Sequence, residues 1–242
     1  MICITFDSDH MSDLRMDEFL NLFAIEGNAT FFCTQRYSSL DESHHEIAPH
    51  PTLVAQTDWT EILKKSRTDF PEAKGWRSHS CVYSHLIAEW LGKNAYNYVS
   101  VHDCFLQKSP RPIKHAWGVW QFPIYYMDNL DFSYKNFWEN VSYKPFNPEI
   151  IENSLENNGV YVYDFHPIHI MLNTPNVEYY MKVRNAFLSG EHIEKIRWNG
   201  YGTANFFNLL MESMNKLGMK SINLFGALNR YDLMLLQYES EV

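Results

Sequence analysis

Short apolar runs alternate with amphipathic stretches along the chain. Runs rich in β-branched and aromatic residues predict strands, and these cover 2–7, 29–34, 45–50, 75–79, 97–102, 117–122, 160–166 and 220–225. Apolar residues at helical spacing predict helices over 11–25, 57–70, 82–92, 134–141, 148–157, 178–188, 203–217 and 228–236. Repeated strand-then-helix units indicate an α/β fold with a mostly parallel sheet or barrel. In such folds the chemistry lies at the carboxyl ends of the strands.

Composition favours one ordinary globular domain. Apolar residues make up 45% and charged residues 20% of the 242 residues, which excludes a disordered, collagen-like or coiled-coil chain. No repeat, low-complexity tract or linker divides the sequence, so we expect a single domain over 1–242. The net charge of −9 disfavours nucleic acid as a partner, because phosphate backbones are repelled.

Cysteine usage and the first residues point to the cytoplasm. The four cysteines form no C-x-x-C pair and are too few for a secreted disulfide scaffold. The sequence starts in a strand-like run, with no signal peptide and no apolar segment of membrane-spanning length. We therefore expect a reduced, cytoplasmic protein without a membrane span, and the sequence leaves the oligomeric state open.

Polar side chains gather where the predicted strands end. Asp7 and Asp9 share one face of the first strand, because side chains alternate along a strand. The other ends carry His50, the pair Arg77 and His79, and the pair Asp164 and His166. Asp and Ser also commonly cap a following helix, so each end alone has an ordinary structural reading. Together, carboxylates and imidazoles at one mouth suit zinc or a similar divalent ion with an open position.

At these residues the sequence resembles the polysaccharide deacetylases of carbohydrate esterase family 4. Residues 5–9 (TFDSD) correspond to the family's T-F-D-D-G or D-x-D strand, and 29–32 (ATFF) to its second strand. Residues 45–50 (HEIAPH) correspond to H-E-I-(G/A)-x-H, and His166 closes a late strand as in the family. The resemblance implies a distorted (β/α) barrel of about seven mostly parallel strands.

Two departures indicate a divergent branch, of the kind found in surface-polysaccharide and O-antigen gene clusters. Val54 stands where the family has a second metal-binding histidine, and residues 77–80 (RSHS) replace its R-x-P-Y motif. We hypothesise that His79 supplies the lost ligand, with His10 as the alternative. The altered motif leaves the donor to the oxyanion open.

The resemblance also implies a reaction and roles. The substrate would be an N-acetylated sugar, with one divalent metal ion as cofactor, zinc being expected and cobalt or nickel possible. Asp9, His50 and His79 would hold the ion, which activates water and polarises the amide carbonyl. Asp7 would be the general base, kept ionised by Arg77.

His166 would be the general acid, with its tautomer set by Asp164 or a backbone carbonyl. Asp128 is a further candidate for substrate or metal contact, or a turn former. His169 would face away from His166 if the strand continued in extended form.

Two other functions stay open. One is a related metal-dependent hydrolase of C–N bonds in non-sugar amides. The other is a catalytically degenerate module that binds glycan, which the missing histidine at Val54 favours. The retained residues Asp7, Asp9, Arg77 and His166 argue against the second, because buried charges are costly to keep together.

Overall fold

The computed structural model describes residues 1–54, 58–133 and 142–240, and its central feature is a parallel sheet. In the described residues this sheet has five strands in the order β3-β2-β1-β9-β8, all parallel. The strands are β1 Ile2–Asp7, β2 Ala29–Cys33, β3 Glu46–Pro49, β8 Ile124–Met127 and β9 Tyr161–Phe165. The buried, near-continuous apolar run of β1 is typical of a strand covered on both faces.

A second, smaller sheet continues from the β3 side. Among the described residues it has four short strands in the order β4-β5-β7-β6, with only β6 antiparallel to its neighbour. These strands are β4 Gly75–Trp76, β5 Tyr98–Val99, β6 Ile113–Lys114 and β7 Trp120–Gln121. The mostly parallel α/β architecture expected from the sequence is confirmed.

A few backbone hydrogen bonds link the two sheets at each side. The Arg77 N–H donates to the Pro49 carbonyl at 3.3 Å, and Asp103 forms an isolated parallel bridge with Ile124. Within the described part of the chain these links do not extend into continuous ladders, so the barrel-like arrangement is not closed.

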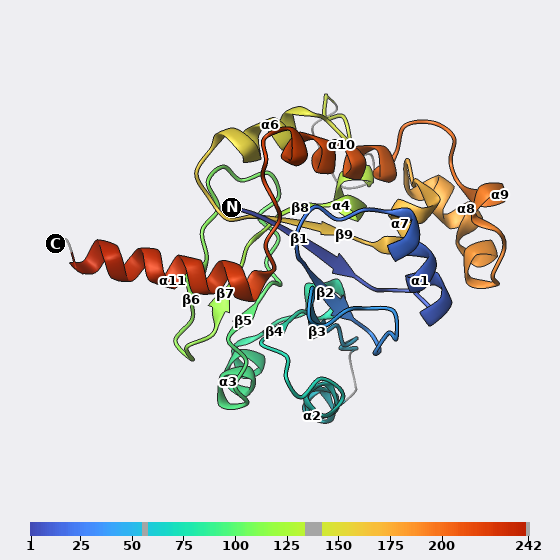
Figure 1. The fold of residues 1–242 in the computed structure, drawn as a ribbon. Coiled ribbons are helices and arrows are strands. Elements are labelled where there is room, and N and C mark those ends of the chain that lie inside the picture. Colours follow the sequence, from blue (N-terminus) through green and yellow to red (C-terminus); the bar gives the residue numbers. More distant parts are fainter. Residues whose placement is uncertain (55–57, 134–141, 241–242) are drawn as a thin grey trace.

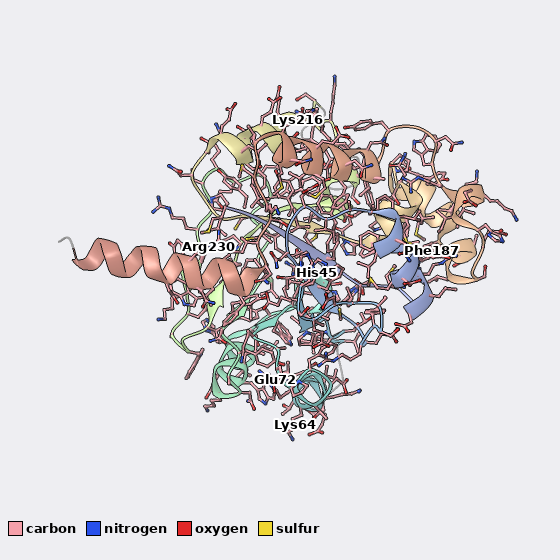
Figure 2. All side chains as sticks on the ribbon, in the orientation of Figure 1. His45, Lys64, Glu72, Phe187, Lys216 and Arg230 are labelled. Atoms are coloured by element: carbon pink, nitrogen blue, oxygen red, sulfur yellow. The ribbon has the colours of Figure 1, made fainter. Side chains whose placement is uncertain are left out.

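Helices pack against the central sheet (Figure 1). Phe207 of α10 contacts Phe165 with ring centroids 5.2 Å apart, and Phe19 of α1 contacts Phe6 at 5.4 Å. The helices are α1 Asp13–Leu22, α2 Trp59–Asp69, η1 His79–Cys81 (3-10), α3 His85–Lys93, α4 Asp128–Phe132, α6 Glu149–Glu156, α7 Pro167–Leu172, α8 Val177–Leu188, α9 Ile193–Ile196, α10 Thr203–Lys216 and α11 Leu224–Ser240. Charged side chains such as Lys64 and Glu72 lie on the outside (Figure 2). No helix in the described ranges is both long and apolar enough to cross a membrane.

The local structure differs from the sequence predictions at three places. Residues 220–225 do not form a strand: Ser221 makes one bridge to Gly27, and α11 begins at Leu224. The strand β8 was not predicted, because all four of its residues are buried and apolar, without the alternation of a half-exposed strand. The chain after His166 turns at once into α7 instead of staying extended. The helix predicted over 134–141 lies outside the described residues.

Candidate active site

The carboxyl ends of the strands bring together side chains from distant parts of the chain. Asp7 is the last residue of β1, His50 directly follows β3, and Arg77 directly follows β4. His166 follows β9. The His50 N–H donates to the Cys33 carbonyl at 2.8 Å and so continues the β2–β3 ladder. This register fixes where the His50 ring lies.

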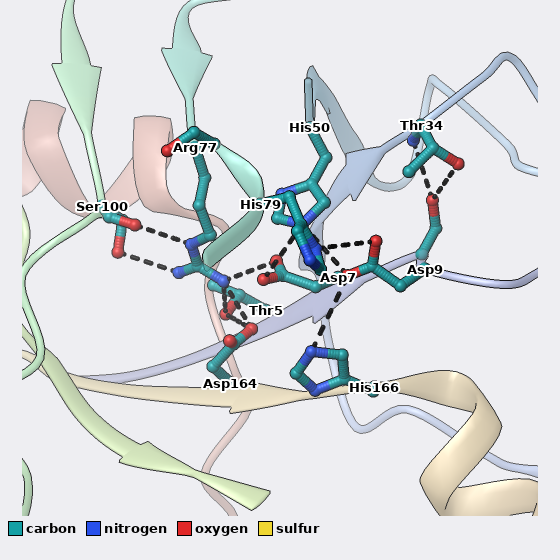
Figure 3. Close-up of polar contacts among 12 residues, drawn as sticks. Thr5, Asp7, Asp9, Thr34, His50, Arg77, His79, Ser100, Asp164 and His166 are labelled. Atoms are coloured by element: carbon teal, nitrogen blue, oxygen red, sulfur yellow. Dashed lines mark hydrogen bonds and ion pairs between the residues drawn. The ribbon is translucent and has the colours of Figure 1, made fainter. Parts of the chain in front are cut away.

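Asp9 is the centre of the site (Figure 3). Its Oδ2 lies 3.2 Å from Nε2 of His50, and its Oδ1 lies 3.1 Å from Nδ1 of His79. Nε2 of His166 lies 3.9 Å from Oδ2, on the other side of the carboxylates in Figure 3. Asp7 lies beside this group, with Oδ2 at 3.6 Å from Nε2 of His50. Histidines from three segments therefore surround one carboxylate.

Arg77 is fully buried and lies between Ser100 and the carboxylates of Asp7 and Asp164 (Figure 3). Its NH1 donates to Oδ1 of Asp7 at 2.8 Å and also to Oδ1 of Asp164. Its Nε and NH2 donate to the carbonyl and hydroxyl of Ser100 at 2.7 and 2.9 Å. Burial acts to lower the pKa of Arg77, but Asp164 and Asp7 outweigh it and raise that pKa. Arg77 thus leaves Oδ2 of Asp7 as the oxygen that faces the site.

Asp128, not Asp164, orients His166. Oδ1 of Asp128 lies 2.8 Å from Nδ1 of His166, and Oδ2 accepts the His166 backbone N–H at 2.9 Å. Asp164 instead pairs with Arg77 and accepts from the Thr5 hydroxyl at 2.9 Å. The expectation that Asp164 or a backbone carbonyl sets the His166 tautomer is therefore corrected. In the sequence, the only signal for Asp128 was an acid at the end of an aromatic run.

The contacts shift the titration of these groups. Burial acts to raise the pKa of Asp9, but hydrogen bonds with His50 and His79 outweigh it and hold that pKa well below its usual range. Burial acts to lower the pKa of His166, but the Asp128 carboxylate raises it to about 10. The hydrogen bond with Asp9 raises the pKa of His79. Burial raises the pKa of Asp164, although Arg77 acts in the opposite direction.

Three other residues discussed from the sequence lie around this centre. His10 is exposed, and its Nε2 lies 3.2 Å from NH2 of Arg184 rather than against Asp9. His169 is not turned away from His166: α7 brings the two ring centroids to 5.3 Å. That prediction is wrong because Pro167 starts a helix, and residues three apart on a helix are neighbours. Val54 is exposed in the segment after β3.

Two cavities open beside the centre. The first, of about 240 Å³, is lined by Asp7, His50, Cys81 and Asp103 among others. The second, of about 320 Å³, is lined by side chains of α7 and α8. Both are lined by the same four residues, Asp9, His79, Asn129 and His166. A substrate bound across them would therefore pass over the candidate catalytic groups.

The donor set suits a divalent metal ion. Asp9, His50 and His79 each offer one ligand atom, and these atoms lie within 4.8 Å of one another. One carboxylate oxygen with two imidazole nitrogens matches the ligand chemistry of catalytic zinc, which keeps a further position open. Asp7, Asp9 and His166 form an overlapping group, and so do Asp128, His166 and His169. Asp9 and His166 each belong to two of these groups.

Comparisons with known proteins give a consistent picture. A family model described as WbmS-like polysaccharide deacetylase matches residues 4–184. The chain is similar to a solved structure from Bordetella bronchiseptica, described as a polysaccharide deacetylase involved in O-antigen biosynthesis, with TM-score 0.72 and 22% identity over 88% of this chain and 90% of that chain. A 4-alpha-glucanotransferase from Thermococcus litoralis gives TM-score 0.50 and 12% identity, over 95% of this chain and 38% of that chain.

A solved polysaccharide deacetylase from Mycobacterium smegmatis gives TM-score 0.43 and 14% identity, over 92% of each chain. No curated protein matches. At these identities the likeness to solved structures concerns the fold, and the match to the family model is what identifies the chain's relatives.

Proposed function

Because this chain belongs to the WbmS-like family of polysaccharide deacetylases, we propose that it removes an acetyl group from an N-acetylated sugar with one bound divalent metal ion. The observation that carries the proposal is the position of Asp9. Its two oxygens meet His50 and His79 at 3.2 and 3.1 Å, with Asp7 and His166 beside them. The resemblance of residues 5–9 and 45–50 to the family motifs supports the same assignment.

Asp9, His50 and His79 would hold the ion, with zinc the expected metal. A bound divalent ion polarises the carbonyl to be attacked and lowers the pKa of water toward ~7. His79 would take the place of the family histidine that is replaced by Val54. The contact between His79 and Asp9 supports this role, because His79 supplies a third donor atom from a segment other than those of Asp9 and His50.

Asp7 would act as the general base through Oδ2. Its Oδ1 already accepts from Arg77, and that ion pair holds the carboxylate in place with Oδ2 toward His50. The proton of the attacking water would pass to Oδ2 as the new C–O bond forms. Arg77 does not touch the reacting atoms in this scheme and acts by positioning the base.

His166 would act as the general acid through Nε2. Asp128 holds Nδ1, so the proton available for transfer lies on Nε2, which faces Asp9 and the cavities. When the C–N bond breaks, this proton would pass to the leaving nitrogen. The products are acetate and the free amine of the sugar. Such proton transfers contribute about 10²–10⁴-fold to rate.

Metal content and acetate release test the proposal together. We expect about one ion per chain in protein incubated with zinc, cobalt or nickel, and loss of that ion in Asp9→Ala and His50→Ala. His85→Ala, which removes an exposed histidine outside the site, is the matched control. Asp7→Asn should keep the ion and lose acetate release from N-acetylglucosamine saccharides.

The same measurements separate the alternatives. Failure to bind any of the three metals would overturn the proposed chemistry and favour a glycan-binding module. Metal binding with acetate released from simple acetamides, but from no sugar tested, would favour a hydrolase of non-sugar amides.

A further inference from the structure

The second cavity beside the site has an apolar wall that the proposed chemistry does not use. Its volume is about 320 Å³, and Phe132, Val177, Tyr180 and Met181 are among the residues that line it. Met181 is 61% exposed, so the wall stays accessible from solvent. Aromatic and apolar side chains of this kind fit the C–H face of a sugar ring, while polar groups at the end of a pocket fix its orientation.

His10 lines this cavity, and Arg184 contacts His10 from α8. Arg184 follows Tyr180 by one turn of α8, so the two side chains lie on the same face of the helix. NH2 of Arg184 lies 3.2 Å from Nε2 of His10, which itself lines the cavity. Because a guanidinium can only donate, Nε2 of His10 accepts, and the proton of the neutral ring lies on Nδ1. The pair thus presents N–H donors and one full positive charge.

Among the residues that the structure describes, no carboxylate forms an ion pair with Arg184. Its Nε is buried and has no hydrogen-bond partner within this part of the chain. The carboxylates that act on the neighbouring Tyr180 are Asp9 and Asp128, and both are already paired with histidines. Arg184 is therefore a cation with no carboxylate partner in the described ranges, next to a residue that lines the second cavity.

The backbone at His10 supports a specific placement of this side chain. His10 has φ 62°, in the left-handed region that a residue with a Cβ adopts at a cost. It directly follows Asp9, so the strained residue links the centre of the site to the second cavity. Backbone strain of this kind is typical of functional sites.

We propose that Arg184 and His10 bind an anionic group, a phosphate or a carboxylate, carried by the sugar substrate. The sugar ring would lie against the wall formed by Tyr180 and Met181, with the acetamido group over the candidate catalytic groups. Guanidinium is well suited to this task, because it binds both kinds of oxyanion through paired hydrogen bonds. The inference rests on the proposed deacetylase function and narrows its substrate class from N-acetylated sugars to charged ones.

Titration calorimetry at fixed ionic strength tests the inference directly. The probes are N-acetylglucosamine, its 1-phosphate, and N-acetylglucosaminuronic acid. We expect one of the two charged sugars to bind about 10- to 100-fold more tightly than the neutral one, the range for hydrogen bonds to charged groups. The charged sugar with the larger gain in affinity over the neutral sugar identifies the preferred anion as phosphate or carboxylate.

Variants link this preference to the two residues. Arg184→Gln should reduce it to less than about threefold, and Arg184→Lys should retain part of it, because the charge stays and the paired geometry is lost. Lys182→Gln removes the same charge from the same helix at an exposed position, and should keep the preference. His10→Asn should weaken the preference, since asparagine tolerates the left-handed backbone but lacks the imidazole.

Equal binding of neutral and charged sugars would overturn the inference, and so would equal losses in Arg184→Gln and Lys182→Gln. Acetate release from the three sugars separates this result from failure of the proposed function. If the neutral sugar is deacetylated as well as the charged ones, and Arg184→Gln slows all three alike, the anion site is wrong and the function stands. If no sugar is deacetylated but Arg184-dependent binding persists, the anion site stands and the function is wrong.

Discussion

The carboxylate of Asp128 holds both the ring and the backbone of His166. Oδ1 lies 2.8 Å from the ring nitrogen Nδ1, and Oδ2 accepts the backbone N–H at 2.9 Å. Asp128 is the first residue of α4, directly after β8, and it is fully buried. One side chain therefore fixes the position of His166, its ring orientation and the nitrogen that remains available for proton transfer.

Replacing Asp128 by asparagine should impair proton transfer while leaving the metal ligands in place. An amide carries no charge and cannot stabilise the imidazolium, so we expect kcat for acetate release to fall about 10²-fold. Elemental analysis should find the metal content unchanged. Asp17→Asn, an exposed position on α1, is the matched control. A variant with full activity would show that His166 does not need Asp128 to act.

Arg77 should be more important for stability than any surface ion pair. It is fully buried between Asp7 and Asp164, and Arg77→Met would leave two buried carboxylates facing each other. We expect the free energy of unfolding to fall by about 3–5 kcal/mol, measured by denaturant titration. Arg36→Met, which breaks an exposed pair with Glu42, should cost about 0–1 kcal/mol. Equal losses in the two variants would contradict this account.

The choice between His79 and His10 as the third metal ligand can be tested by affinity. Nδ1 of His79 lies 3.1 Å from Asp9, whereas His10 contacts Arg184. Loss of a residue that only supports a metal ligand weakens metal affinity about 10- to 100-fold. His79→Ala should weaken zinc affinity by more than this, because it removes a ligand itself. His10→Asn should leave zinc affinity within a few-fold of the original, as measured by competition with a chelator. The reverse order would assign the ligand to His10.

The sequence predicted the candidate site through its strand ends. Asp7, His50 and His166 each lie at or directly after a short apolar run, and carboxyl ends of parallel strands meet at one edge of a sheet. The structure brings these three side chains to Asp9, together with Arg77 and His79. Assigning them catalytic or metal-binding roles stays a prediction, as do the single domain and the cytoplasmic location.

The partner of His166 and the position of His169 could not be predicted, because the local signal for each was ambiguous. Asp128 lies 38 residues before His166, and the strand that delivers it is buried throughout, so its sequence lacks the alternation that marks a strand. Pro167 was compatible with the end of a strand, but proline also fits the first position of a helix, where its missing N–H has no partner to lose. Only tertiary packing decides between these readings.

We expect protonation of His45 to lower the free energy of unfolding as the pH falls. His45 lies at the opposite end of the sheet from the candidate site. Its Nδ1 accepts the Ala29 backbone N–H at 3.2 Å, and its ring contacts Phe31. Burial, with a smaller effect of His44, lowers the pKa of His45 to about 4, against about 6.5 in the unfolded chain. Between these pH values His45 binds more protons in the unfolded chain than in the folded one. The stabilisation that comes from its lowered pKa is therefore complete above pH 6.5 and is lost as the pH falls toward 4.

The measurement is the free energy of unfolding at pH 7.5 and 5.0. His45→Gln keeps an acceptor for the Ala29 N–H but cannot titrate, so this variant should lose less stability between the two pH values than the unchanged protein. His192→Gln removes a histidine from an exposed position away from His45 and should keep the original pH dependence. If all three proteins lose the same stability, protonation of His45 does not destabilise the folded state. The pH dependence must then come from the buried carboxylates and histidines of the site.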